Sequence, residues 1–323
     1  MQHTAKQLAS SLRLMRFGLG LAMIASLGLA SHRALAAAAM AEPTTASTAA
    51  QAVSMVKVNG LDFPVLDIGK GPAVLLLHGF PDSHAVWRKQ IDPLVAAGFR
   101  VIAPDLRGFG DAPRPEGVAE YGLSKSVGDM VGLLNALNID KANVIGHDWG
   151  AALAWGLAQY QPERVAKLAV LSVGAPGTGA FDTIEQREKS WYFNFFQFEG
   201  VAEANLKQND WALFRQLMRN EGDVDAAVRN FSRPGALTAG LNWYRANLKP
   251  SLRDLTPHPS PKVKCATLGI WSDGDHYLTE AQMQASAQVA ANWRYEKMNG
   301  AGHWMMLEQP ERLNRLLVGF LTN

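Results

Sequence analysis

The chain has 323 residues, of which 48% are hydrophobic, enough to bury one large core with or without an inserted segment. Charged residues make up 19% with both signs interspersed, and the formal net charge of +2 argues against nucleic acid as a partner. The only cysteine is Cys265, which excludes an intramolecular disulfide and a thiolate metal cluster.

The N-terminal region has the pattern of a secretory signal. Basic residues precede an apolar run at 17–30, and an Ala-Leu-Ala triplet follows at 34–36. We therefore predict a signal peptide over 1–39, a flexible Ala/Thr/Ser-rich leader over 40–52, and export to a periplasm or an extracellular space. The alternative is an uncleaved membrane anchor, but the run is shorter than the roughly 20 apolar residues of a spanning helix. No stable membrane insertion is expected once the signal is removed.

From residue 53 onwards, apolar runs of strand length alternate with helical patterns. A β-hairpin is predicted over 56–67, and helices over 124–137 and 151–160. Continuous apolar runs, typical of strands buried on both faces, occur at 73–77, 101–105, 142–146, 168–172 and 266–271. This alternation predicts a mostly parallel, doubly wound α/β sheet.

The alternation stops in the middle of the chain. Residues 176–257 are helical in composition and dense in Trp, Tyr and Phe, and the α/β pattern resumes afterwards. The sequence therefore predicts an α/β core over 53–175 and 258–323 that carries an inserted helical cap over 176–257. Most of the cap's aromatic side chains are expected to pack against one another.

The strongest local motif is Gly-His-Asp-Trp-Gly at 146–150, directly after a predicted strand and before a predicted helix. This is the setting of a nucleophile elbow, in which glycines permit a very sharp turn. Asp148 occupies the nucleophile position, although Asp is also a favoured helix N-cap. A carboxylate suits displacement at an sp³ carbon, which gives an ester that water can hydrolyse.

Partners for Asp148 follow in the chain order of this fold, which is nucleophile, acid, histidine. Asp273 and Asp275 both come after the predicted strand at 266–271, and either could be the acid. His303 lies between Gly302 and a predicted helix near the C-terminus. We expect it to act as a general base.

A third motif, His-Gly-Phe-Pro at 78–81, follows the first buried strand. In this fold, the backbone N–H groups of Phe80 and Trp149 would form an oxyanion hole. Phe80, Trp149 and Trp304 are expected to line the substrate pocket. His78 is expected to be a structural hydrogen-bonding residue.

Together these motifs resemble the epoxide hydrolase branch of the α/β-hydrolase superfamily over about residues 55–320. The resemblance rests on HGFP (78–81), DLRGFG (105–110), GHDWGA (146–151), the S-x-x-D segment 272–275 and GHW (302–304). It implies that Asp275, rather than Asp273, is the acid. It also implies two cap tyrosines that bind the epoxide oxygen, which would be Tyr192 and Tyr244.

The resemblance implies hydrolysis of a small apolar epoxide by water to a vicinal diol, with no metal or cofactor. A haloalkane or haloacetate dehalogenase would share Asp148, Asp275 and His303 but would need halide-binding donors. Phe80 stands where haloalkane dehalogenases carry Asn, and Trp149 stands where haloacetate enzymes carry Arg, which favours an epoxide. A third alternative is a non-enzymatic binding protein on this scaffold. The sequence leaves the oligomeric state open.

Overall fold

The computed structural model describes residues 53–248 and 260–323. The predicted signal peptide and leader lie outside these residues, as does the end of the predicted cap, so those predictions remain predictions. Within the described ranges, no helix combines the length and apolar character needed to cross a membrane.

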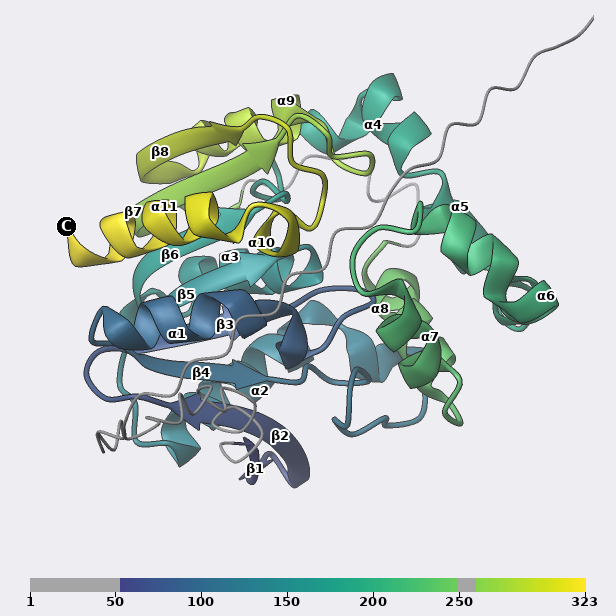
Figure 1. Ribbon diagram of the computed structural model, residues 1–323, viewed down its shortest axis with the longest axis horizontal. Helices are drawn as coiled ribbons and strands as arrows, with labels where there is room; N and C mark the ends of the chain where they lie inside the picture. The colour runs from purple at the N-terminus through teal and green to yellow at the C-terminus, as the bar shows by residue number, and fades with distance from the viewer. Residues whose placement is uncertain (1–52, 249–259) are drawn as a thin grey trace, which may run out of the picture. The chain divides into compact units, whose positions relative to one another are not determined.

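Eight strands form a single sheet in the order β1-β2-β4-β3-β5-β6-β7-β8 (Figure 1). The β1–β2 and β2–β4 pairs are antiparallel, and every other neighbouring pair is parallel. The predicted mostly parallel sheet is therefore confirmed. The strands are β1 (Val53–Val58), β2 (Leu61–Ile68), β3 (Ala73–Leu77), β4 (Arg100–Pro104), β5 (Ala142–His147), β6 (Val165–Leu171), β7 (Val263–Ser272) and β8 (Ala290–Met298).

Helices cover both faces of this sheet, which explains why its central strands are apolar throughout. All five residues of β3 are buried, as are all six of β5. The helices α1 (Arg88–Ala96) and α11 (Pro310–Thr322) pack together in front of the sheet in Figure 1. On the other face, α2 (Leu123–Ala136) packs against α3 (Trp149–Tyr160).

Shorter helices complete the core. The helix α9 (Glu280–Gln284) follows β7, and α10 (Met305–Glu308) precedes α11. Single 3₁₀ turns lie at His84–Trp87, Val118–Tyr121, Pro162–Arg164, Ala180–Asp182 and Ala285–Gln288.

Neither β8 nor α1 was predicted from the sequence. The strand β8 pairs only with β7, so it is an edge strand, and exposed or half-buried polar residues interrupt its apolar positions. Charged side chains on an edge strand are common because they discourage pairing with other chains. They also remove the continuous apolar run that identified the central strands.

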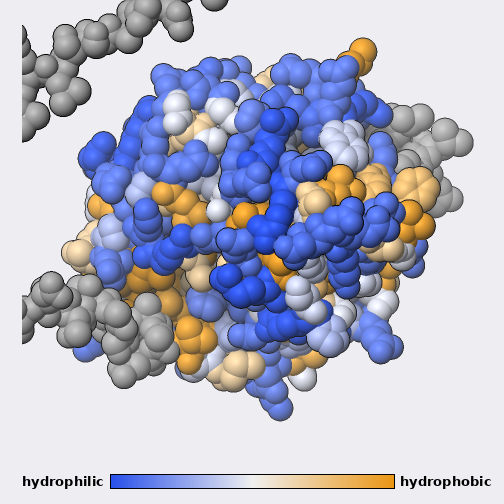
Figure 2. Space-filling view, turned by 45° about the vertical axis from the view of Figure 1, so that its right-hand side comes forward, coloured by the Kyte–Doolittle hydropathy of each residue, from blue (hydrophilic) through white to orange (hydrophobic). Residues whose placement is uncertain are grey.

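A helical insertion occupies the chain between β6 and β7. It contains α4 (Ile184–Lys189), α5 (Tyr192–Phe196), α6 (Val201–Leu217), α7 (Val224–Phe231) and α8 (Ala236–Asn247). Residues 208–211 interrupt α6, and Asn209, Asp210 and Trp211 have left-handed backbone conformations there. Apolar residues reach the surface on the side of the molecule that carries the insertion (Figure 2), among them Trp191, Phe198 and Val201.

Hydrogen bonds between the core and the insertion hold the insertion in place. Arg88 of α1 forms two hydrogen bonds of 2.6 and 3.0 Å with the carboxylate of Asp223, just before α7. The indole N–H of Trp243 in α8 donates to the backbone carbonyl of Arg107. The buried amide of Gln186 in α4 donates to the carbonyl of Tyr277, beyond β7. These contacts set where α5 and α8 lie above the sheet.

The junction between β5 and α3 leaves no room for a side chain on either of its glycines. A Cβ on Gly150 would lie 2.1 Å from the carbonyl oxygen of Leu77, and one on Gly146 would lie 2.3 Å from the carbonyl oxygen of Gly150. Both obstacles are backbone atoms, so they cannot rotate away. Strand and helix therefore approach this closely only because both positions are glycine.

We expect Gly150→Ala to destabilise the protein by about 3 kcal/mol or more, because the added methyl group overlaps the backbone of β3. Gly128→Ala is a matched control, since Gly128 lies inside α2 and a Cβ there meets no atom within 4 Å. That change should stabilise the protein by about 0.5–1 kcal/mol through helix propensity. Urea unfolding measures both, and equal effects at the two positions would contradict this account.

Candidate active site

Asp148 lies at the turn between β5 and α3 with φ 53° and ψ −123°. Such left-handed φ values are unfavourable for a non-glycine residue and persist where the surrounding structure imposes them. Asp148 occupies the N-cap position of α3, yet its carboxylate makes no capping hydrogen bond. The side chain instead points across the end of the sheet, so helix capping does not account for this residue.

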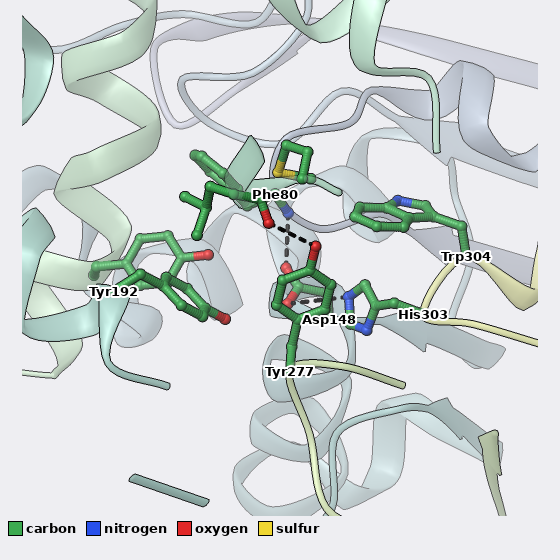
Figure 3. Close-up of a pocket in the computed structure, with 9 residues that line it drawn as sticks. Phe80, Asp148, Tyr192, Tyr277, His303 and Trp304 are labelled. Carbon is green, nitrogen blue, oxygen red and sulfur yellow. Dashed lines mark hydrogen bonds and ion pairs between the residues drawn. The ribbon is translucent and has the colours of Figure 1, made fainter. Parts of the chain in front are cut away.

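Two backbone N–H groups hold the Asp148 carboxylate. The N–H of Phe80 donates to Oδ1 over 2.8 Å, and the N–H of Trp149, the next residue, also favours the charged carboxylate and lowers its pKa. A Cβ on Gly79 would lie 2.3 Å from Asp148 Oδ1, so this close approach requires glycine at position 79. The N–H of Phe80, one of the two predicted oxyanion donors, thus points at Asp148 (Figure 3).

His303 lies beside Asp148 in the loop after β8. Its Nδ1 is 2.9 Å from Asp275 Oδ2, and its Nε2 is 3.8 Å from Asp148 Oδ2. The other oxygen of Asp275 accepts hydrogen bonds from the N–H groups of Tyr277 and Leu278, at 2.8 and 2.9 Å. The structure therefore brings together the three residues predicted as nucleophile, base and acid.

Asp273 takes no part in this cluster. Its side chain is exposed and accepts a hydrogen bond from the N–H of Gly300. Of the two carboxylates that the chain order left open, only Asp275 reaches His303.

The charges of this cluster shift one another's pKa values. Burial alone would lower the pKa of His303, but Asp275, and after it Asp148, raise it to about 9. Burial raises the pKa of Asp148, against the opposing effects of His303 and the two N–H donors. The pKa of Asp275 lies below its ordinary value because His303 and the backbone donors outweigh its burial. His303 is therefore protonated at neutral pH, paired with the ionised Asp275.

Tyr192 of α5 and Tyr244 of α8 are the insertion's contribution to the site. Both rings are buried, their centroids are 6.0 Å apart, and both line the same cavities as Asp148. Burial and then the charge of Asp148 raise both phenol pKa values well above the ordinary value. The two hydroxyls therefore remain protonated and can donate hydrogen bonds next to Asp148.

Two cavities meet at Asp148, Tyr192 and Tyr244. The smaller has a volume of about 20 Å³, and its other walls are Phe80, Leu217, Met218, Tyr277, His303 and Trp304. The larger has a volume of about 330 Å³ and extends between the core and the insertion. Of the residues predicted to line a pocket, Phe80 and Trp304 face the smaller cavity and Trp149 faces the larger.

Several residues of the smaller cavity were missed by the sequence analysis. Leu217 and Met218 lie at the end of α6, where no motif marks them. Tyr277 donates its hydroxyl to the Leu217 carbonyl over 2.9 Å (Figure 3). Asp82 accepts a hydrogen bond from the indole of Trp304, and burial raises its pKa to about 7. The one sequence signal for Asp82 was its position directly after the motif at 78–81.

Two further polar residues, His78 and Asp105, support the loops of the site. His78 accepts a hydrogen bond from the N–H of Leu106, which confirms its predicted structural role, and burial lowers its pKa to about 4. Asp105 accepts hydrogen bonds from the N–H groups of His84 and Asp111. In the described part of the chain, no group of three or more His, Cys, Asp or Glu side chains could hold a metal ion.

Comparison with known proteins identifies the family of this chain. The alpha/beta hydrolase fold family matches residues 72–310. The chain is 35% identical to the AB hydrolase superfamily protein YfhM of Bacillus subtilis, over 83% of this chain and 97% of that protein. It is 32% identical to epoxide hydrolase A of Mycobacterium tuberculosis, over 83% of this chain and 96% of that protein.

Solved structures of epoxide hydrolases have the same fold. The Bacillus megaterium epoxide hydrolase in complex with an inhibitor aligns with a TM-score of 0.77 and 25% identity, covering 84% of this chain and all of that one. Epoxide hydrolase A from Mycobacterium thermoresistibile aligns with a TM-score of 0.71 and 30% identity, covering 84% and 98%. The chain therefore belongs to the α/β-hydrolase fold family, and it is an enzyme of the hydrolase class that is similar to epoxide hydrolases.

Proposed function

We propose that this enzyme hydrolyses epoxides to vicinal diols through a covalent ester on Asp148. The observation that carries the proposal is the placement of two tyrosine hydroxyls, those of Tyr192 and Tyr244, in the same cavities as the Asp148 carboxylate. An epoxide needs both groups at once, a nucleophile at carbon and a hydrogen-bond donor at oxygen. The names of the relatives agree with this assignment.

In the first step, an oxygen of Asp148 attacks an epoxide carbon. A carbon–oxygen ester bond forms, and the bond from that carbon to the ring oxygen breaks. Tyr192 and Tyr244 donate hydrogen bonds to the ring oxygen as negative charge develops on it, and one of them supplies the proton that completes the new hydroxyl. The attacking carboxylate is held in position by the N–H of Phe80.

In the second step, His303 removes a proton from water, and the water oxygen attacks the carboxyl carbon of Asp148. The resulting oxyanion is stabilised by the N–H groups of Phe80 and Trp149, which face this carboxyl group. The bond from the carboxyl carbon to the diol oxygen then breaks, and His303 returns its proton to the departing alkoxide, so that the diol leaves. The proton of the restored Asp148 carboxyl group passes to the tyrosinate formed in the first step, which regenerates the enzyme. Asp275 orients His303 and stabilises its charged form.

The charges in the site favour ester formation first and activation of water second. Esterification removes the negative charge of Asp148, one of the groups that raise the pKa of His303. The pKa of His303 therefore falls when the ester forms, which favours the neutral, basic form of the ring when water must be activated.

A dehalogenase would use the same Asp148 and His303 but would release a halide ion. That anion needs donors at the leaving-group position, and Phe80 places an aromatic ring in the smaller cavity. We therefore favour the epoxide, and an alkyl bromide serves below as the competing substrate.

Replacing His303 with Gln should trap the ester, because water is then no longer activated. Incubation of His303→Gln with styrene oxide is expected to add the mass of one substrate, located on Asp148 by peptide mass spectrometry. The double variant Asp148→Ala/His303→Gln is the control and should remain unmodified. An adduct from an alkyl bromide alone would favour the dehalogenase, and no adduct from either compound would exclude the ester mechanism.

Replacing Tyr192 or Tyr244 with Phe removes one donor to the developing alkoxide. Each single change should lower kcat/KM for an epoxide by about 100-fold, the effect of losing one oxyanion donor, and the double change should abolish turnover. Tyr121→Phe is the matched control, because its buried hydroxyl donates to the carbonyl of Pro115 instead. Epoxide turnover by the double variant at the wild-type rate would show that these tyrosines do not bind the oxygen.

Removal of the Asp148 charge should lower the pKa of His303. Asp148 favours the protonated ring, so the midpoint for Asp148→Asn should fall below the value of about 9 and the charge should be lost at lower pH. NMR titration of the ring measures this directly. His84, which pairs with Asp105, is the internal control and should keep its midpoint. An unchanged His303 midpoint would refute the coupling between the two residues.

A further inference from the structure

The two cavities beside Asp148 differ greatly in size. The smaller, of about 20 Å³, exceeds only slightly the roughly 10–15 Å³ that a single water molecule needs. The larger, of about 330 Å³, has the size of a small ligand pocket. An epoxide held between Asp148 and the tyrosine pair therefore has room for carbon atoms on one side only.

The walls of the smaller cavity are fixed by their own hydrogen bonds. The hydroxyl of Tyr277 is bonded to the carbonyl of Leu217, which precedes Met218. The indole of Trp304 is bonded to Asp82, and its ring packs so closely on Gly222 that a Cβ there would lie 2.8 Å away. Expansion of this cavity would break these contacts, so it accepts one water-sized group and not a second carbon chain.

The larger cavity is apolar and uncharged apart from Asp148. Its walls include Leu123, Ala152, Val173, Phe181 and Phe193.

Asn247 also lines the larger cavity, but its side-chain amide is already hydrogen-bonded to backbone groups. Its oxygen accepts from the N–H of Leu123, and its nitrogen donates to the carbonyls of Tyr121 and Trp243. The described walls thus offer no cation to bind an anionic substituent, and Asp148 would repel one.

We propose that the enzyme is specific for terminal epoxides with a single apolar, uncharged substituent. This inference rests on the proposed function. The substituent occupies the larger cavity, and the smaller cavity holds only the ring methylene or the attacking water. Internal epoxides, which carry carbon on both sides of the ring, are rejected by the walls at Leu217, Met218 and Trp304.

Two isomeric substrates test the asymmetry in the wild-type enzyme. The terminal 1,2-epoxyoctane and the internal trans-4,5-epoxyoctane have the same atoms and similar hydrophobicity, so they differ only in how carbon is distributed about the ring. We expect kcat/KM to favour the terminal isomer by about 100-fold or more, since a misfit of even one methylene in a tight pocket costs about 10–200-fold. The anionic epoxide glycidate should not be turned over.

Variants of each cavity should change the preference in opposite directions. Met218→Ala enlarges the smaller cavity and should shift the ratio of kcat/KM at least about tenfold towards the internal isomer. Val173→Phe fills the larger cavity and should lower kcat/KM for 1,2-epoxyoctane relative to propylene oxide. The control is Phe198→Ala, an exposed residue of the insertion outside both cavities, which should change neither ratio.

The outcomes separate this inference from the proposed function. Turnover of both epoxyoctanes at similar rates, with no response to Met218→Ala, would refute the proposed specificity for terminal epoxides. Epoxide hydrolysis itself would still stand. The absence of turnover of any epoxide, together with no adduct in His303→Gln, would overturn both.

Discussion

The close approach of β3 to the turn after β5 is the constraint on which the site depends. Asp148 is held at φ 53° in that turn, with its carboxylate against the backbone N–H of Phe80 at the end of β3. Glycines at 79, 146 and 150 make the approach possible, because a Cβ at any of them would overlap neighbouring atoms. The geometry converts an acid that could have capped a helix into a carboxylate that is 13% exposed and whose carboxyl group faces two backbone N–H groups.

Two kinds of group stabilise charge around that carboxylate. Fixed backbone dipoles from Phe80 and Trp149 stabilise negative charge on the carboxyl group and need no reorganisation during a reaction. The His303–Asp275 pair is titratable, and the pKa of His303 depends on whether Asp148 is charged. In the proposed mechanism, this dependence delays base catalysis until the ester has formed. Burial and then the same negative charge raise the pKa values of the two tyrosines, so both hydroxyls are protonated before the reaction begins.

The helical insertion adds what the α/β core lacks. It brings Tyr192 and Tyr244 over Asp148, and it closes the smaller cavity with Leu217 and Met218 at the end of the interrupted helix α6. The core fixes the position of these elements through contacts such as Arg88 with Asp223. A shift of the insertion would therefore change both the donors to the substrate oxygen and the space available on each side of the ring.

The sequence by itself predicted the parallel sheet and the roles of Asp148 and His303, because these features leave local signals. Continuous apolar runs identify strands covered on both faces, and the Gly-framed turn at 146–150 can form only where a strand meets a helix. Tertiary structure decided what depends on distant contacts. The chain order left Asp273 and Asp275 open, the family resemblance favoured Asp275, and in the structure only Asp275 reaches His303. The edge strand β8 follows from its pairing with β7. The unequal cavities follow from how α6 packs above the sheet, since the volume left between two packed elements is recorded in no single segment of the chain.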